Sequence, residues 1–374
     1  MPRQIQMSQP DIRDEDIALV TQALRSNWIS LGPFLDRFER AFADYIGVDH
    51  AVAVSSGTAG LHLCICSAGI APGDEVITTP FSFVASANCI LYERGTPIFV
   101  DIDEQSLNID PKLVRAAITP RTRAVLPVHV FGQPCDLDGL LPIALEHGIP
   151  LIEDACEAIG AEFRGRKVGT FGKAAVFGFY PNKQITMGEG GVIVTNDPKW
   201  AATFRILRNQ GRIEMGSWLR HERLGFNYRL DEMSAALGLS QLARLEELLH
   251  RRDKVASMYA EQLADIPGVT LLSPVETTTR LSWFVLIVRL SEGINRDQVI
   301  RHLQERGIPS RTYFSPIHLQ PYFVETFGFR EGDFPVAERV ARSTLALPFH
   351  ANMPPADVDY VATGLRMAIE SATV

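Results

Sequence analysis

Short runs of apolar and β-branched residues alternate with helical patterns along the middle of the chain. The candidate strands are residues 51–54, 75–78, 98–101, 124–128, 151–153, 174–177 and 192–195, and the helical patterns between them include 58–68, 84–92 and 137–146. Strand–helix–strand alternation predicts an α/β layer on a largely parallel sheet, because parallel strands need long crossover connections.

The flanking segments predict helices beside this layer and a second unit after it. Helical patterns cover 12–26, 33–46 and a long stretch at 230–263. The C-terminal part has an apolar strand (283–289), a helix (297–306), a proline-rich segment (309–321) and a final helix (356–369). We therefore expect a large α/β domain over 1–250 and a smaller α+β domain over 251–374, with the first residues, up to about 30, packing on the small domain.

Composition and charge argue against several classes of protein. The 374 residues have a formal net charge of −8 and no block of Lys and Arg, which argues against nucleic-acid binding. The N-terminus lacks the apolar core of a signal peptide, and no apolar run reaches membrane-spanning length. Five cysteines without a CxxC pair are typical of reduced thiols rather than of a zinc site. We expect a cytoplasmic protein without a metal site, a membrane contact or a nucleic-acid partner.

Polar residues follow several of the predicted strands. In open α/β sheets, ligands bind beyond the carboxyl ends of the strands. Ser56, Gly57 and Thr58 follow the strand at 51–54 and open a helix, where free backbone N–H groups suit a phosphate. An ordinary helix N-cap explains the same residues, so this motif alone does not decide between the two.

Asp154 and Lys183 follow two further strands. Asp154 could pair with a protonated ring nitrogen, or it could cap the helix after it. Lys183 lies beside aromatic residues, and partial burial favours the neutral amine that attacks an aldehyde, although an exposed loop lysine is the alternative. With Phe83 as a ring for stacking, these groups together match the needs of pyridoxal phosphate (PLP). Neither a Walker A motif nor a GxGxxG fingerprint follows a predicted strand.

A series of motifs then covers nearly the whole chain. They include Asn27-Trp-Ile-Ser-Leu-Gly32, Ser56-Gly-Thr-Ala59, Thr79-Pro-Phe-Ser-Phe-Val-Ala85, Pro127-Val-His-Val-Phe-Gly132, Glu153-Asp-Ala155, Tyr180-Pro-Asn-Lys183, Gly188-Glu-Gly-Gly191, Arg208-Asn-Gln-Gly211, Gly225-Phe-Asn-Tyr-Arg229 and Pro316-Ile-His318. In these motifs the chain resembles the DegT/DnrJ/EryC1/StrS family of PLP-dependent sugar aminotransferases, close to its perosamine-synthase-like members. The resemblance implies fold type I: a large domain with a mostly parallel mixed sheet flanked by helices, and a smaller α+β C-terminal domain.

The resemblance also implies roles for individual residues. Lys183 matches the lysine that bonds to the cofactor, and Asp154 matches the acid on its ring nitrogen. Phe83 matches the stacked aromatic residue. The phosphate-binding helix start corresponds to Ser56, Gly57 and Thr58. Asn227 matches an asparagine that reaches the phosphate of the partner subunit, which implies a homodimer with shared active sites.

Two positions depart from the common pattern of the family. Gly178 stands where relatives often have a serine that holds the phosphate, so another group must replace that hydroxyl. Glu157 stands near the cofactor's 3-oxygen, where relatives often have glutamine. Relatives that are dehydratases have histidine in place of the lysine, and Lys183 argues against that activity.

We expect L-glutamate to donate its amino group, leaving pyridoxamine phosphate, and a nucleoside-diphosphate keto-sugar to accept it. The acceptor is expected to be a 4-keto-6-deoxyhexose for aminosugar or polysaccharide biosynthesis, with amination of a 3-keto-sugar as the alternative. Candidate sugar-nucleotide contacts are Trp28, Ser30, Arg229, Tyr313 and His318. For Trp28, Tyr313 and His318 the alternative is a packing role.

Other functions on this fold remain open from the sequence. A non-catalytic regulator is one, but no helix-turn-helix or basic arm supports DNA binding. An aldolase, decarboxylase or desulfurase of fold type I is another. A protein that only binds sugar nucleotides is a third, and it would leave Lys183 without a role.

Overall fold

The computed structural model describes residues 4–213 and 220–372. In this part of the chain, a central sheet joins two ladders. One has the order β1 (His50–Val54), β9 (Gly191–Thr195), β8 (Ala174–Gly178) and β5 (Ile152–Asp154), and the other has the order β3 (Thr96–Phe99), β2 (Glu75–Thr78) and β4 (Thr122–Val125). Parallel bridges from Val125 to Leu151 and from Val128 to Asp154 join them. Among these strands β9 runs antiparallel to both of its neighbours, so the sheet is mixed but mostly parallel, as predicted.

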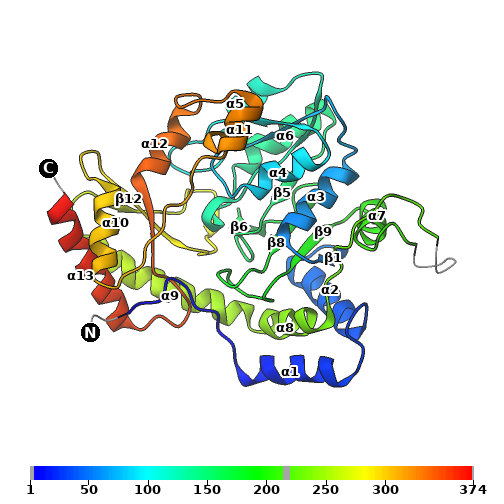
Figure 1. Ribbon diagram of the computed structural model, residues 1–374, viewed down its shortest axis with the longest axis horizontal. Coiled ribbons are helices and arrows are strands. Elements are labelled where there is room, and N and C mark those ends of the chain that lie inside the picture. The colour runs from blue at the N-terminus through cyan, green and yellow to red at the C-terminus, as the bar shows by residue number, and fades with distance from the viewer. Residues whose placement is uncertain (1–3, 214–219, 373–374) are drawn as a thin grey trace.

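Helices cover both faces of this sheet (Figure 1). Along β1, Val52 and Val54 belong to one buried cluster, whereas Ala51 and Ala53 belong to another on the opposite face. Successive strand residues point to opposite faces, so this division is what a sheet buried on both sides requires. The first cluster includes side chains of α3 (Gly57–Ser67), α4 (Ala85–Tyr92) and α7 (Pro198–Arg208), and the second includes α2 (Pro33–Ile46) and α8 (Glu232–Ala243). A third cluster lies under α5 (Pro111–Ala117) and α6 (Leu137–His147).

The start of α2 depends on a residue 200 positions away. Pro33 occupies the first turn, where a missing N–H costs nothing, but Gly32 at the N-cap has no side chain to accept a hydrogen bond. The buried carboxylate of Glu232 instead accepts the N–H groups of Gly32, Phe34 and Leu35 at 2.9, 2.8 and 3.0 Å. This carboxylate fixes α2 against α8.

The helical stretch predicted at 230–263 is two helices rather than one. It divides at Arg244, whose backbone is non-helical, into α8 and α9 (Leu245–Leu263). The guanidinium of Arg244 pairs with Asp11 and with Asp16 of α1 (Asp14–Arg25), 2.7 Å away in each case. The break lets α8 pack on α1 and α2, while α9 continues toward the C-terminal sheet (Figure 1).

The C-terminal part forms an antiparallel sheet of its own with the order β10 (Val269–Leu271), β12 (Leu286–Leu290) and β13 (Thr344–Leu347). Its buried cluster draws on α9, α10 (Arg296–Glu305) and α13 (Pro355–Ala372). Smaller elements complete the fold: β6 (Glu162–Phe163), β7 (Arg166–Lys167), β11 (Thr278–Arg280), α11 (Pro321–Phe327), α12 (Pro335–Ser343), and 3-10 turns at Val130–Gly132 and Ile317–Leu319. We propose that the second domain begins inside α9.

The N-terminal residues divide between the two parts. Ile5 joins the C-terminal cluster, and its N–H donates to the carbonyl of Gly307. The N–H of Phe349 likewise donates to the carbonyl of Met7. By contrast α1 packs on α8 of the large part, so the expected contact with the C-terminal part is made by the chain before α1. Among the described residues, no helix is both long enough and apolar enough to cross a membrane.

Candidate active site

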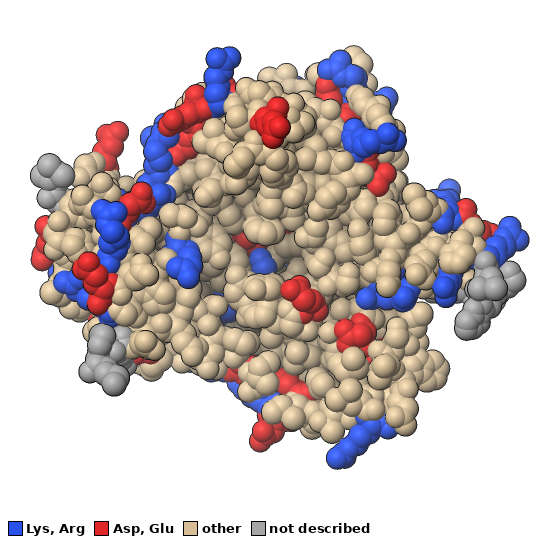
Figure 2. Space-filling model, in the orientation of Figure 1, with Lys and Arg blue, Asp and Glu red and all other residues tan. Residues whose placement is uncertain are grey.

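A cavity of about 500 Å³ opens at the carboxyl ends of β1, β5 and β8, and segments of the C-terminal part close it from the other side. Figure 2 shows the hollow near the centre of the molecule, with basic and acidic atoms inside it. The strand-end residues Ser56, Gly57, Thr58, Phe83, Asp154, Glu157 and Lys183 all line this cavity. The parallel strands therefore bring the predicted cofactor-binding residues together, with the exception of Asn227.

The start of α3 forms one end of the cavity. Ser56 is the N-cap, and its hydroxyl oxygen accepts the N–H of Ala59 at 3.1 Å. The first N–H groups of a helix have no acceptor within that helix, so those of Gly57 and Thr58 are available to an anion. A Cβ atom on Gly57 would lie 2.8 Å from Cys156 Sγ, which explains the glycine at this position. The capping interpretation is confirmed, and the phosphate interpretation stays a prediction that the position of these residues on the cavity wall allows.

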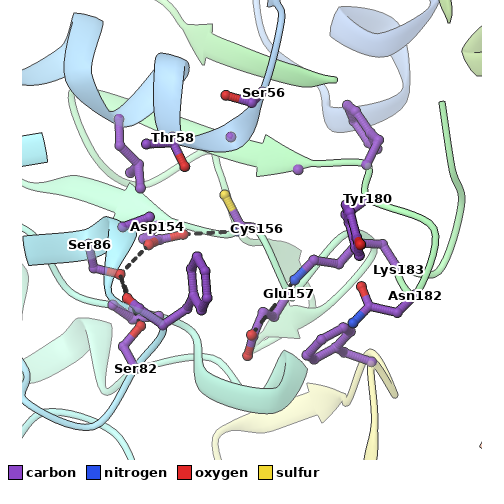
Figure 3. A pocket seen from close by; sticks show the side chains of 18 of the residues that line it. Ser56, Thr58, Ser82, Ser86, Asp154, Cys156, Glu157, Tyr180, Asn182 and Lys183 are labelled. Carbon is purple, nitrogen blue, oxygen red and sulfur yellow. Dashed lines mark hydrogen bonds and ion pairs between the residues drawn. The ribbon is translucent and has the colours of Figure 1, made fainter. Parts of the chain in front are cut away.

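Asp154 presents a buried carboxylate to the middle of the cavity (Figure 3). Ser86 Oγ donates a hydrogen bond to Asp154 Oδ2 at 2.7 Å, and the backbone N–H of Cys156 donates to Oδ1 at 3.2 Å. Ser82 Oγ lies 2.9 Å from Ser86 Oγ and extends this network. These bonds fix the orientation of the carboxylate, which is suited to accept a hydrogen bond from a protonated ring nitrogen.

Lys183 points into the cavity from the loop after β8 (Figure 3). The loop turns at Pro181, and the N–H of Lys183 donates to the carbonyl of Tyr180 at 2.9 Å, as in a β-turn. The Lys183 side chain is only 14% exposed. Its Nζ atom lies 3.9 Å from the centroid of the Phe284 ring and 3.7 Å from Glu157 Oε1. The predicted burial of this amine is confirmed.

Glu157 faces the amine from the opposite wall. Its Oε2 accepts the backbone N–H of Phe131 at 2.9 Å. Burial raises the pKa of Glu157 above its usual range, and the positive charge of Lys183 opposes that shift. Burial, followed by the nearby Glu157, raises the pKa of Tyr313 on the same cavity wall. This end of the cavity therefore holds groups that can exchange protons with the amine or with a bound ring.

The chemistry of this cavity fits PLP. The helix start suits the phosphate, Asp154 suits the ring nitrogen, and Lys183 suits the aldehyde. Phe83 is 62% exposed in spite of its apolar ring, and it lies on the cavity wall, where a flat ligand would cover it. Gly178 also lines the cavity, beside Cys156, and leaves open the place of a serine side chain.

The structure does not bring all predicted substrate residues to this cavity. Tyr313 lines it, but Trp28, Ser30, Arg229 and His318 do not. His318 is buried, with Nε2 3.0 Å from Glu338 Oε1 and its ring 4.7 Å from that of Phe334. The His318 side chain therefore packs against Phe334 and Glu338, outside the proline-rich segment, and does not line this cavity.

Trp28, Ser30, Arg229 and Asn227 belong to two neighbouring segments. An isolated bridge between Ser30 and Asp231 places these segments side by side. Trp28 is 58% exposed, with its indole N–H donating to the carbonyl of Ser30, and Arg229 donates to the side chain of Asn209. Asn227 is exposed and does not line the cavity of its own chain.

Several residues that line the cavity were not predicted. Ser86 orients Asp154, Phe284 covers the lysine amine, and Asn182 adjoins Lys183. Ser86 lies in the first turn of the predicted helix at 84–92, but no local pattern indicates that its hydroxyl contacts Asp154. No sequence signal points to Phe284, because it reaches the lysine from the other part of the fold.

One group of potential metal ligands lies elsewhere in the described part of the chain. His62, Cys66 and Glu93 place their ligand atoms within 4.8 Å of one another. His62 Nε2 lies 2.9 Å from Glu93 Oε1, the Cys66 thiol donates to the same oxygen, and His62 Nδ1 bonds to the hydroxyl of Tyr228. These groups satisfy one another by hydrogen bonding, and none of them lines the cavity.

Comparisons with known proteins agree with this site. The model of the DegT/DnrJ/EryC1/StrS aminotransferase family matches residues 10–366. The chain is 42% identical over 368 residues to GDP-perosamine synthase of Caulobacter vibrioides, covering 98% of each protein. It is 40% identical over 379 residues to the spore coat polysaccharide biosynthesis protein SpsC of Bacillus subtilis, covering 98% of this chain and 97% of the relative.

Solved structures show the same fold. PseC of Helicobacter pylori, an aminotransferase involved in pseudoaminic acid biosynthesis, superposes with a TM-score of 0.94 at 30% identity, covering 99% of this chain and 100% of that one. Spr1654 of Streptococcus pneumoniae in its PLP form superposes with a TM-score of 0.94 at 27% identity, covering 100% of both chains. The fold, the cavity and these relatives together show that the chain belongs to the DegT/DnrJ/EryC1/StrS aminotransferase family, as a PLP-dependent sugar aminotransferase.

Proposed function

We propose that the enzyme transfers the amino group of L-glutamate to a nucleotide-linked 4-keto-6-deoxyhexose. The observation that carries this proposal is the Lys183 amine, buried opposite Asp154 in a cavity whose other end is a helix start. The similarity to GDP-perosamine synthase supports a keto-sugar acceptor. The similarity to a spore coat polysaccharide protein supports a role in polysaccharide biosynthesis.

The residues of the cavity divide the work between holding the cofactor and moving protons. The N–H groups of Gly57 and Thr58 bind the phosphate, Phe83 stacks on the ring, and Asp154 keeps the ring nitrogen protonated. PLP, when bound, supplies an electron sink for the bonds broken at the donor's Cα. Lys183 Nζ, once free, would act first as a base that removes the proton from the donor's Cα and then as an acid that returns a proton.

We infer that the working form is a homodimer with shared active sites. Asn227 is exposed and lies off its own cavity, as expected for a residue that serves a partner's phosphate. Large apolar side chains are exposed on the segments beside it, namely Trp28, Ile29, Leu31 and Leu224. A second copy that covers these side chains would remove them from water. Sedimentation of Asn227→Ala and of the wild type, together with their affinity for PLP, tests this arrangement.

The substrate assignment is tested with ¹⁵N-labelled L-glutamate and a panel of GDP-, dTDP- and UDP-linked keto-sugars. Mass spectrometry detects the label in the sugar, and NMR of the product locates the new amine. We expect label at C4 of a 6-deoxyhexose and no transfer by Lys183→Ala. Label that enters only 3-keto-sugars, or none of the panel, would contradict the proposed acceptor.

A further inference from the structure

A buried arginine with no acidic partner lies behind the catalytic lysine. Arg252 of α9 is only 3% exposed. Among the described residues, no carboxylate lies within ion-pairing distance of its guanidinium, which packs 5.3 Å from the centroid of the Phe349 ring. Burying an uncompensated charge is costly, so a retained one calls for a specific reason.

The hydrogen bonds of Arg252 all go to backbone carbonyls around the active site. Its Nη2 donates to the carbonyl of Lys183 itself, at 3.1 Å. Its Nη1 donates to the carbonyls of Trp283 and Phe284, at 3.2 and 3.3 Å. The ring of Phe284 is the one that lies 3.9 Å from Lys183 Nζ. One guanidinium thus joins the backbone of the lysine to the backbone of the aromatic residue that covers its amine.

We propose that Arg252 is a positioning residue for Lys183, which sets the place of the lysine amine by clamping two chain segments from different parts of the fold. A planar guanidinium presents several N–H donors in a fixed arrangement, so it can hold three carbonyls in one geometry where an ammonium cannot. The inference rests on the role of Lys183 in the proposed function, but on neither the donor nor the sugar.

The two segments are also joined without Arg252. Gln184 Nε2 donates to the carbonyl of Ser282 at 3.2 Å and lies 2.8 Å from its hydroxyl oxygen. The Ser282 hydroxyl in turn donates to the carbonyl of Ile159 at 2.6 Å. Because this second link remains, loss of Arg252 is expected to shift the lysine while the fold persists.

Arg252 keeps a positive charge in this buried position. Burial lowers the pKa of Arg252 to about 10, so the side chain still carries its charge at neutral pH. The titratable groups that line the cavity with Lys183 are Asp154, Cys156, Glu157, Tyr180, Glu189 and Tyr313, and Glu157 Oε1 lies 3.7 Å from Lys183 Nζ.

The test compares Arg252→Met, which removes both the planar guanidinium and the charge, with Arg252→Lys, which keeps a charge but lacks the planar guanidinium. Arg251→Met is the matched control, because Arg251, the neighbour of Arg252 on α9, pairs with Asp11 and Glu247 instead. The first readout is a pH titration of the visible absorbance of each PLP-loaded enzyme, which needs no substrate. The second is kcat and KM for the amino donor.

Because displacement changes the distance between the amine and Glu157, we expect the absorbance titration of Arg252→Met to shift by about half a pH unit or more. Displacement of the amine is expected to lower kcat roughly 100-fold, with KM changed by less than about 3-fold. Arg252→Lys also loses the planar guanidinium and should share both changes. Arg251→Met should match the wild type in both.

Wild-type titration and kcat in Arg252→Met would overturn the proposal, as would equal changes in Arg251→Met. Should Arg252→Met not fold, Arg252→Lys decides, and a wild-type kcat in that variant would overturn the clamp. Failure of the proposed donor or sugar appears separately, as a wild-type enzyme that titrates normally but does not transfer nitrogen to the panel.

Discussion

Replacing Gly178 by serine is expected to strengthen cofactor binding. Gly178 ends β8 and lines the cavity beside the start of α3. A Cβ atom at this position would meet the Cβ and Sγ atoms of Cys156 at 3.5 Å, an ordinary van der Waals distance. Serine therefore fits without displacing its neighbours. By contrast, a Cβ atom on Gly57 would lie only 2.8 Å from the same sulfur.

The size of the effect follows from the bond that the hydroxyl can make. A hydrogen bond to a charged group contributes roughly 1.5–3 kcal/mol, and each 1.4 kcal/mol or so is a factor of ten in affinity. We expect Gly178→Ser to bind pyridoxamine phosphate about 10- to 100-fold more tightly than the wild type. This ligand has no aldehyde, so the bond to Lys183 does not contribute to its affinity.

The measurement is a titration of apoprotein with pyridoxamine phosphate, followed by fluorescence. Gly178→Ala adds the same Cβ atom without the hydroxyl and should bind within about 3-fold of the wild type, because it gains no hydrogen bond. Pyridoxamine, which lacks the phosphate, should not distinguish the three proteins. If Gly178→Ser and Gly178→Ala bind pyridoxamine phosphate equally well, the phosphate does not lie at the end of β8 and the assignment of the helix start is refuted.

Two further predictions concern stability. Because the pKa of Glu157 is raised in the folded protein, folding binds more protons there, so stability falls as pH rises from about 4.5 through the folded pKa. The apoprotein of Glu157→Gln should lose part of this decline in urea unfolding between pH 5 and pH 8, and an unchanged decline would contradict the assignment. Glu232→Ala leaves three buried N–H groups at the start of α2 unpaired and should cost roughly 3 kcal/mol or more of unfolding free energy. Glu232→Gln, which keeps an acceptor, should lose clearly less, and equal losses would show that hydrogen bonding is not the cause.

The alternation of strands and helices was enough to predict the α/β layer, and the strand ends were enough to predict which residues of the large part line the cavity, among them Lys183 and Asp154. The direction of β9 was not predictable, because an apolar strand reads the same in either direction. The predicted strand at 283–289 starts late, at Leu286, since the carbonyls of Trp283 and Phe284 bond to Arg252. Likewise Asp101, predicted as the last residue of a strand, lies beyond the end of β3 and accepts the N–H groups of Val336 and Ala337 at the start of α12.

These differences share a physical origin. Each depends on a partner far away in the sequence, and local patterns carry no information about such partners. The same reason explains which residues of the candidate site could be predicted. Lys183 and Asp154 follow predicted strands, so the local pattern was enough to identify them. Phe284 could not be identified in this way, because it reaches the cavity from the C-terminal part. His318 lies within the proline-rich segment, yet its side chain is buried against Glu338.

Visible absorption is the direct test of the role proposed for Lys183, namely that its amine bonds to PLP and that the nitrogen of an amino donor displaces it. The purified protein and Lys183→Ala are each supplied with PLP, freed of excess, and measured before and after L-glutamate is added. We predict a yellow wild-type protein whose band fades with glutamate, and a Lys183→Ala protein that shows no such change at a comparable rate. A wild-type protein that stays colourless after PLP is supplied, or a Lys183→Ala protein that responds as the wild type does, would contradict the account.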